Sequence, residues 1–249
     1  HPFLSIPAAM LAGVTSGFIT GILQTKMGID SLLSGIIVNT ALYSINIAIM
    51  GNSSLINLNK TETVFTMLKT ALDGTSMAGM YKAVIAVIAV AATVIFLALF
   101  LSTRLGLAIR ATGNNPDMVR SSSINPVFTT LVGLCVANAF TALSGCMLGQ
   151  LQKSVNIDIG TGMVTMALAS LLIGRAFLGR GKITTRAIGA VLGAVIFRIV
   201  YAVELRFNMP AFMLKFVSSV IVIIAISGPY LKSRIPVIKR RLSAKKARA

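Results

Sequence analysis

The sequence predicts an all-α, polytopic membrane protein, and three features support that fold class. Charged residues make up 12% of the 249-residue chain, about half of the roughly 25% that is usual in soluble domains. Apolar runs close to 20 residues long recur, which is the length that a helix needs to cross a hydrocarbon core of about 30 Å. The connections between the apolar runs alternate between few and many lysine and arginine residues, as expected for loops on opposite sides of a membrane.

Seven apolar segments are expected to span the membrane. The third, residues 83–103, carries no charged residue and ends at Arg104. The others are interrupted by glycine, polar or charged residues, which is typical of broken or closely packed helices. The seven predicted spans are 3–23, 31–50, 83–103, 127–149, 159–178, 187–203 and 211–231.

The positions of lysine and arginine orient these spans. One side receives the basic connection 104–126 and the tail 232–249, together with Lys26, Arg175, Arg180, Lys182 and Arg186. The other side receives Lys60, Lys69, Lys82, Lys153, Arg206 and Lys215. The richer side is predicted to be cytoplasmic in a prokaryotic plasma membrane. Because this places the first residues outside, we expect one further span ahead of His1.

This orientation divides the chain into a transmembrane domain, residues 1–231, and a basic cytoplasmic tail, residues 232–249. The loop 51–82 is then extracytoplasmic, and "ETVFTMLKTAL" within it predicts an amphipathic helix, either lying on a surface or docking a receptor. The net charge of +17 is explained by basic groups facing the anionic lipid bilayer. No nucleic-acid partner is expected. Anchoring and specific docking both remain open as roles for the tail.

An internal repeat is visible when residues 16–30, "SGFITGILQTKMGID", are compared with residues 144–158, "SGCMLGQLQKSVNID". Seven of the fifteen positions are identical. Because three spans separate the copies, the copies run in opposite directions through the membrane. This predicts inverted halves, roughly 3–103 and 127–203, of the kind that place a transport pathway between them.

Several motifs in these spans have a structural and a functional interpretation. Glycines at 13, 17 and 21, at 145 and 149, and at 189 and 193 predict close helix packing. Asp30 and Asp158 are expected to cap the helices that follow them. Polar side chains at helical spacing indicate either interhelical hydrogen bonds or a wet pathway, and both remain open. The candidate pathway residues are Asn39, Tyr43, Asn46, Asn138, Thr141, Thr161 and Thr165.

The sequence offers no catalytic or metal-binding group of residues. Its one histidine is His1, and its two cysteines, Cys135 and Cys146, lie in one apolar run. The segment "GRGKITT" lacks the spacing of a phosphate-binding loop. A membrane enzyme is therefore disfavoured, and any use of ATP and Mg²⁺ requires a partner chain.

The polar connection 104–125 is predicted to form a short helix, a turn at "GNNP", a second short helix and a turn at "INP". Gly113 is expected to permit the first turn, while Pro116 and Asp117 suit the first turn of the second helix. Such an element can transmit force, whereas a loose loop serves only as a connection.

At this connection the sequence becomes recognisable. "RLGLAIRATGNNPDMVRSSSIN" resembles the cytoplasmic coupling segment of ABC-importer permeases in the branched-chain amino-acid and ribose permease family. "LLSGIIVNTALYSINIAIMG" (32–51) and "NIDIGTGMVTMALASLLIGRAF" (156–177) resemble a narrower branch, the tryptophan/tyrosine-type permeases. One departure is Ser121–Ser123, where the family favours glycine or leucine.

The resemblance implies a permease homodimer with two cytoplasmic ATP-binding subunits and an extracytoplasmic substrate-binding receptor. It implies import of a small solute, an amino acid and possibly an aromatic one, by alternating access. A self-sufficient secondary transporter or channel is the alternative, but neither needs a docking element. The coupling residues implied are Ala108, Ile109, Arg110, Ala111, Thr112, Gly113, Asn114, Asn115, Pro116 and Asp117.

Overall fold

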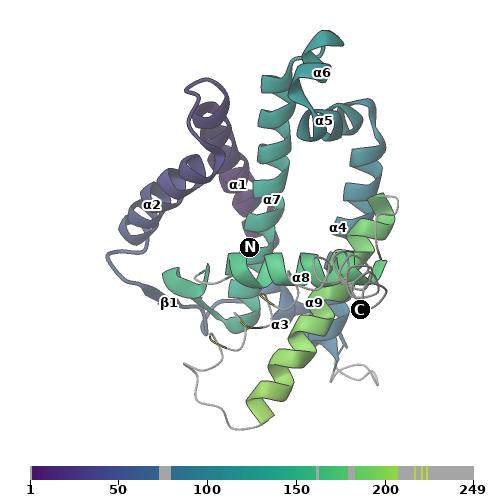
Figure 1. The fold of residues 1–249 in the computed structure, drawn as a ribbon. Coiled ribbons are helices and arrows are strands. Elements are labelled where there is room, and N and C mark those ends of the chain that lie inside the picture. The colour runs from purple at the N-terminus through teal and green to yellow at the C-terminus, as the bar shows by residue number, and fades with distance from the viewer. Residues whose placement is uncertain are drawn as a thin grey trace, which may run out of the picture. The chain divides into compact units, whose positions relative to one another are not determined.

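The computed structural model describes residues 2–72, 80–160, 163–178 and 183–206, with the single positions 216, 220 and 223. Most of these residues are helical (Figure 1). The helices are α1 (Pro2–Thr25), α2 (Ser31–Ile49), α3 (Val64–Leu72), α4 (Tyr81–Ser102), α5 (Arg104–Asn114), α6 (Pro116–Ser121), α7 (Pro126–Gln152), α8 (Met163–Leu178) and α9 (Ile183–Arg206). The strands are β1 (Leu55–Asn57) and β2 (Ser154–Asn156), and a 3-10 turn, η1, covers Ile157–Gly160.

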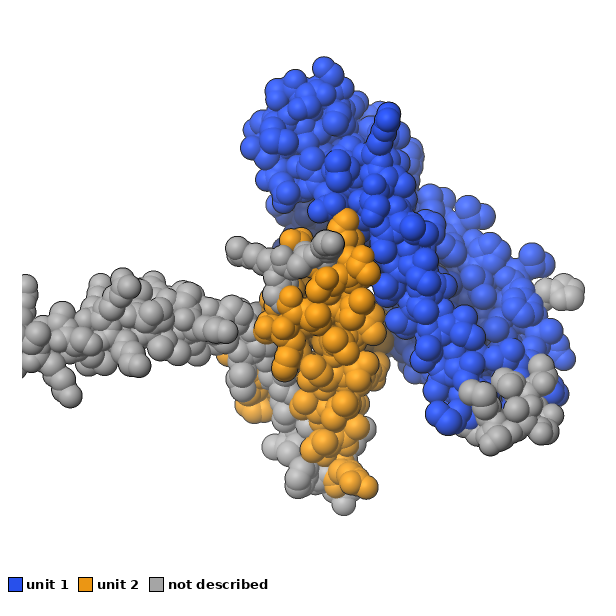
Figure 2. Space-filling model, turned by 90° about the vertical axis from the view of Figure 1, so that its right-hand side faces the viewer, with its two compact units in different colours: residues 1–159 blue, residues 160–249 orange. Residues whose placement is uncertain are grey.

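Backbone contacts divide the chain into two compact units, residues 1–159 and residues 160–249, which Figure 2 shows in separate colours. The first unit contains α1 to α7 and both strands, and the second contains α8 and α9. The proposed functional residues that the structure describes in detail lie in the first unit.

The structure confirms a helical fold with several membrane-spanning helices. Five described helical segments are long and apolar enough to cross a membrane, in α1, α2, α4, α7 and residues 183–203 of α9. These match five of the predicted spans. The span predicted at 159–178 is shorter in the structure, because η1 precedes α8 and α8 begins only at Met163. The predicted span 211–231 lies outside the described residues, apart from three single positions.

Helices α1 and α7 form the centre of the first unit. Gly13 of α1 lies against Asn138 of α7, whereas Gly21, two turns further along α1, lies against Leu131. Residue numbers rise along α1 as they fall along α7, so the two helices run antiparallel. The two copies of the predicted repeat include the second halves of these helices. Their antiparallel direction is the one that inverted copies require, and the repeat itself stays a prediction.

The close approach of α1 and α7 depends on glycine. A Cβ at Gly17 would lie 2.6 Å from the carbonyl oxygen of Leu134, a backbone atom that cannot move aside easily. The predicted packing role is therefore confirmed for the glycine pattern of α1. It is wrong for Gly145, because nothing lies within 4 Å of the Cβ position there. Gly145 faces a cavity instead.

The second unit is built on the same principle. Helices α8 and α9 pack through small residues, with Gly189 against Gly174 and Gly193 against Ser170. Added methyl groups at these positions would meet backbone atoms of the other helix. The glycine pattern predicted on α9 is confirmed as a packing surface.

Local capping fixes where several helices begin. The side chain of Asp30 accepts hydrogen bonds from the amides of Leu32 and Leu33 at 2.9 and 3.4 Å, so Asp30 caps α2 as predicted. In the second copy of the repeat, Asn156 Oδ1 accepts a 2.9 Å bond from the amide of Asp158 itself. The two copies therefore begin their following helices differently.

A small sheet was not predicted. Strands β1 and β2 pair antiparallel, with Leu55 opposite Asn156 and Asn57 opposite Ser154. The sheet joins the loop that follows α2 to the end of α7. The same loop contains α3, which confirms the amphipathic helix predicted there.

Candidate functional site

The connection 104–125 folds into two short helices, as the sequence predicts. Thr103 begins α5 by accepting a 3.1 Å hydrogen bond from the amide of Gly106. Asn115 has extended backbone angles, φ −157° and ψ 101°, and separates α5 from α6. Its Oδ1 accepts bonds from the amides of Asp117 and Met118, at 3.0 and 3.1 Å. Asn115 is therefore both the turn between the two helices and the cap of the second.

Gly113 does not form this turn. It lies inside α5, which continues to Asn114, and it does not have a positive φ. The prediction failed because a residue with extended angles, Asn115, changes the chain direction without needing the left-handed region that favours glycine. Pro116 takes the first position of α6, as predicted.

The α5–α6 element (residues 104–121) is attached firmly to α7. The hydroxyl groups of Thr112 and Thr129 are 2.7 Å apart, and the Thr129 side chain is only 1% exposed. Ile109 packs against Gly133, one turn further along α7. Val119 of α6 is also 1% exposed. A displacement of α5–α6 must therefore move α7 or break a buried contact.

The candidate coupling residues form an exposed surface over a buried base. Thr112 is buried, while the side chains of Ala108, Ile109 and Ala111 are partly buried. The exposed residues are Arg110, Gly113, Asn114, Asn115, Pro116 and Asp117. The exposed part carries one cationic, one anionic and two amide side chains, and the Asn115 amide oxygen is used to cap α6.

A cavity of about 510 Å³ lies beneath this element. Its lining includes Gln24 and Thr25 at the end of α1, Ile109 and Thr112 of α5, and Pro126 at the start of α7. The α5–α6 element is thus close to both helices of the central pair.

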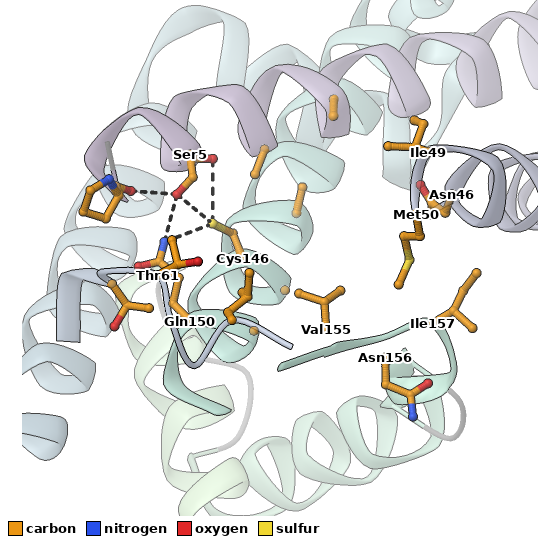
Figure 3. A pocket seen from close by; sticks show the side chains of 18 of the residues that line it. Ser5, Asn46, Ile49, Met50, Thr61, Cys146, Gln150, Val155, Asn156 and Ile157 are labelled. Carbon is orange, nitrogen blue, oxygen red and sulfur yellow. Dashed lines mark hydrogen bonds between the residues drawn. The ribbon is translucent and has the colours of Figure 1, made fainter. Parts of the chain in front are cut away.

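A second cavity, of about 840 Å³, lies at the opposite end of the α1–α7 pair. We call it the end cavity. It is lined by the start of α1, the ends of α2 and α7, strand β2 and the loop before α3 (Figure 3). Small side chains leave this space open where α1 and α7 face each other, namely Ala9, Ala12, Ala142 and Gly145.

One side of the end cavity holds a network of polar side chains around Gln150 (Figure 3). Gln150 is 8% exposed. Its Nε2 donates to the Ser5 hydroxyl at 2.9 Å and to Cys146 Sγ at 3.4 Å. Its Oε1 accepts a 3.0 Å bond from the amide of Val64. Gln150 therefore ties the first turn of α3 to both α1 and α7.

The candidate pathway residues do not form one group in the structure. Asn46 lines the end cavity, whereas Asn39 and Tyr43 are exposed on α2. Asn138 and Thr141 bond to carbonyl groups of their own helix, at Leu134 and Ala137. Thr161 lies outside the described residues, as does the side chain of Thr165 in α8. Their role in a pathway stays a prediction.

Sequence reasoning missed Ser5, Glu62 and Gln150. Gln150 follows directly on the predicted span 127–149, and its partner Val64 is 86 residues away, so no local pattern marked it. Within the described residues, no group of three or more histidine, cysteine or acidic side chains could hold a metal ion.

These features define a class of protein: a helical membrane protein that presents a stiff polar element at one end of its central helix pair and a cavity at the other. Residues 1–226 match the family described as "Branched-chain amino acid transport system / permease component". The chain belongs to this family, as the resemblance predicted.

Among curated proteins, the chain is 30% identical over 222 residues to a tyrosine transport system permease protein of Clostridioides difficile, covering 89% of this chain and 71% of the relative. It is 27% identical over 186 residues to a nucleoside ABC transporter permease protein of Lactococcus lactis, covering 66% of this chain and 49% of the relative. An uncharacterized protein of Rickettsia prowazekii is 24% identical over 231 residues, or 91% and 79% of the two chains. No solved structure matches the chain.

The chain is accordingly a multi-pass permease component of an ABC-type transport system. Its relatives of stated function are transport permeases.

Proposed function

We propose that this permease imports a small solute, an amino acid, into a prokaryotic cell, driven by two partner ATPase subunits that act on the α5–α6 element. The observation that carries the proposal is the buried attachment of this element to α7, through the hydroxyl groups of Thr112 and Thr129. ATP and Mg²⁺ bind to the partner subunits. The permease works as a homodimer in the plasma membrane, with loop 104–126 and the tail in the cytoplasm.

The mechanism follows from the packing. Closure of the ATPases on ATP pushes the exposed surface of α5–α6, and the buried threonine pair transfers the displacement to α7. Because glycine contacts hold α7 tightly to α1, the two helices respond together. The permease then moves between outward-open and inward-open states, and ATP shifts the balance because the ATPases bind the two states with different affinities.

An extracytoplasmic receptor delivers the solute at the opposite end, where α3 and the β1–β2 sheet lie. Gln150 connects this surface to the helix pair. An amino acid is favoured as the solute because the tyrosine transport permease is a relative over most of the chain. An aromatic amino acid is the first solute to test.

A secondary transporter or channel would work without a partner. The α5–α6 element favours the ABC mechanism, since a self-sufficient transporter has no use for an exposed, capped structure that stands on α7. The two mechanisms differ in their energy source, and that difference can be measured.

The test is ATP-dependent uptake of radiolabelled L-tyrosine into vesicles containing the complete transport system, measured together with ATP hydrolysis. Arg110→Glu reverses the charge of an exposed side chain on α5 and should abolish uptake, while Arg110→Lys keeps the charge and should retain most of it. Lys26→Glu, an exposed charge reversal after α1 that belongs neither to α5–α6 nor to the receptor-facing surface, is the control for charge alone. Normal uptake and hydrolysis in Arg110→Glu would contradict the proposed coupling, and uptake that needs only an ion gradient would establish the alternative.

A further inference from the structure

The end cavity combines one anionic group with a mostly apolar wall. Among the described residues that line it, Glu62 is the only charged one. The apolar surface comes from Ile49 at the end of α2, from Met50 directly after it, and from the alanines of α1. A cavity with this lining favours a ligand that has one cationic group and an apolar body.

Glu62 lies on the polar side of the cavity. It is placed between Thr61, which Figure 3 shows beside Gln150, and Val64, whose amide bonds to Gln150 Oε1 at 3.0 Å. Asn46 and Met50 lie on the other side of the cavity in the same view. Glu62, whose side chain is exposed, and the apolar wall therefore belong to different parts of the lining.

No lysine or arginine is found among the described lining residues. A carboxylate on a ligand would have to be met by neutral donors alone, such as the amide groups of Asn46 and Asn156. An ammonium group, by contrast, meets a full negative charge, and charge-assisted hydrogen bonds are about twice as strong as neutral ones.

From this asymmetry we infer that the end cavity is a binding site for a small primary amine with an apolar or aromatic side chain, and that it selects on the amino group through Glu62. The inference rests on the proposed transport of an amino acid and goes beyond it. It places a solute site within one permease chain and states which of the two charged groups of an amino acid is recognised there.

Cys146 offers a direct reporter, because it lines the cavity and is half-buried. Cys135 is its natural control, since it lies eleven residues earlier on α7, packed against Gly17, and is not among the lining residues. Within residues 1–249, a Cys135→Ala variant leaves Cys146 as the one thiol, and Cys146→Ala leaves Cys135. The rate of thiol alkylation then measures occupancy without requiring transport.

The experiment uses membrane vesicles that contain the full-length permease and three probes: L-tyrosine, tyramine, which lacks the carboxylate, and 3-(4-hydroxyphenyl)propionate, which lacks the amine. At ten times its dissociation constant, a bound probe should slow alkylation of Cys146 about 11-fold, because the ligand-free fraction of the permease is 1/(1 + [L]/Kd). The two amines should protect Cys146 and the amine-free acid should not. Alkylation of Cys135 should not change.

Glu62→Gln should raise the dissociation constants of both amines roughly tenfold. Lys60→Gln changes an exposed residue two positions away that does not line the cavity, and it should leave both dissociation constants unchanged. An unchanged rate of Cys146 alkylation without ligand shows that each variant is folded at this site.

Three outcomes would overturn the inference. The first is equal protection by the acid and the amines, and the second is undiminished protection in Glu62→Gln. The third is no protection by either amine in vesicles that do take up L-tyrosine, which would remove the site but leave the proposed function standing. Protection without uptake would support the site and count against the proposed transport.

Discussion

Replacing Asn115 with alanine should loosen α6 without unfolding the protein. Asn115 Oδ1 accepts both amide bonds that cap this helix, and loss of such a cap costs about 1 kcal/mol. A helix of six residues is not stable by itself, so this cost appears as local opening. Because 1.4 kcal/mol corresponds to a factor of ten, the open population of α6 should rise about fivefold.

Hydrogen exchange measured by mass spectrometry tests this directly. Amides near the end of α6, at Arg120 and Ser121, should exchange about fivefold faster in Asn115→Ala, while those of α7 should not change. Asn114→Ala is the matched control, because Asn114 is the adjacent exposed residue and accepts neither cap bond. Asn115→Asp should restore protection. Equal exchange in Asn115→Ala and Asn114→Ala would refute the view that this cap makes the element stiff.

Substitutions in α5, α1 and α7 test the rest of the packing. Gly113→Pro should reduce ATP-dependent uptake strongly, because proline inside α5 costs about 3 kcal/mol. Gly113→Ala should be tolerated, since nothing lies within 4 Å of the new Cβ, and equal uptake by the two variants would contradict this. Gly17→Ala should destabilise the protein by about 1–3 kcal/mol through overpacking, while Gly145→Ala, which has open space, should leave the thermal unfolding midpoint unchanged. Gln150→Leu should release the loop before α3, at a cost of about 1–3 kcal/mol, and speed tryptic cleavage after Lys60, whereas the exposed Gln152→Leu should not.

The features that could be predicted from the sequence depend on local interactions. Apolar length identified the spans, and Asp30, Pro116 and the pattern around Val64 predicted helix starts that the structure contains. Each of these signals acts within a few residues. The family resemblance then added what local patterns cannot provide, the role of the exposed connection.

The features that were missed depend on contacts between distant segments. The β1–β2 pair and the bond from Val64 to Gln150 join residues that are 86 or more positions apart in the sequence. No local pattern indicates such contacts. Gly113 was misread for a different reason: an Asn-Pro step with extended backbone angles made the turn. The end cavity arises where small residues of two helices meet, which requires knowing their register.

The most direct test of the central claim is cross-linking from position 110. In a chain with both cysteines replaced, Arg110→Cys should form a cross-link to the ATP-binding subunit that yields more product in one nucleotide state than in the other. It should also be alkylated only from the cytoplasmic side, and Lys60→Cys only from the opposite side. Alkylation of position 110 from outside the cell, or the absence of any cross-link in an active complex, would contradict the account.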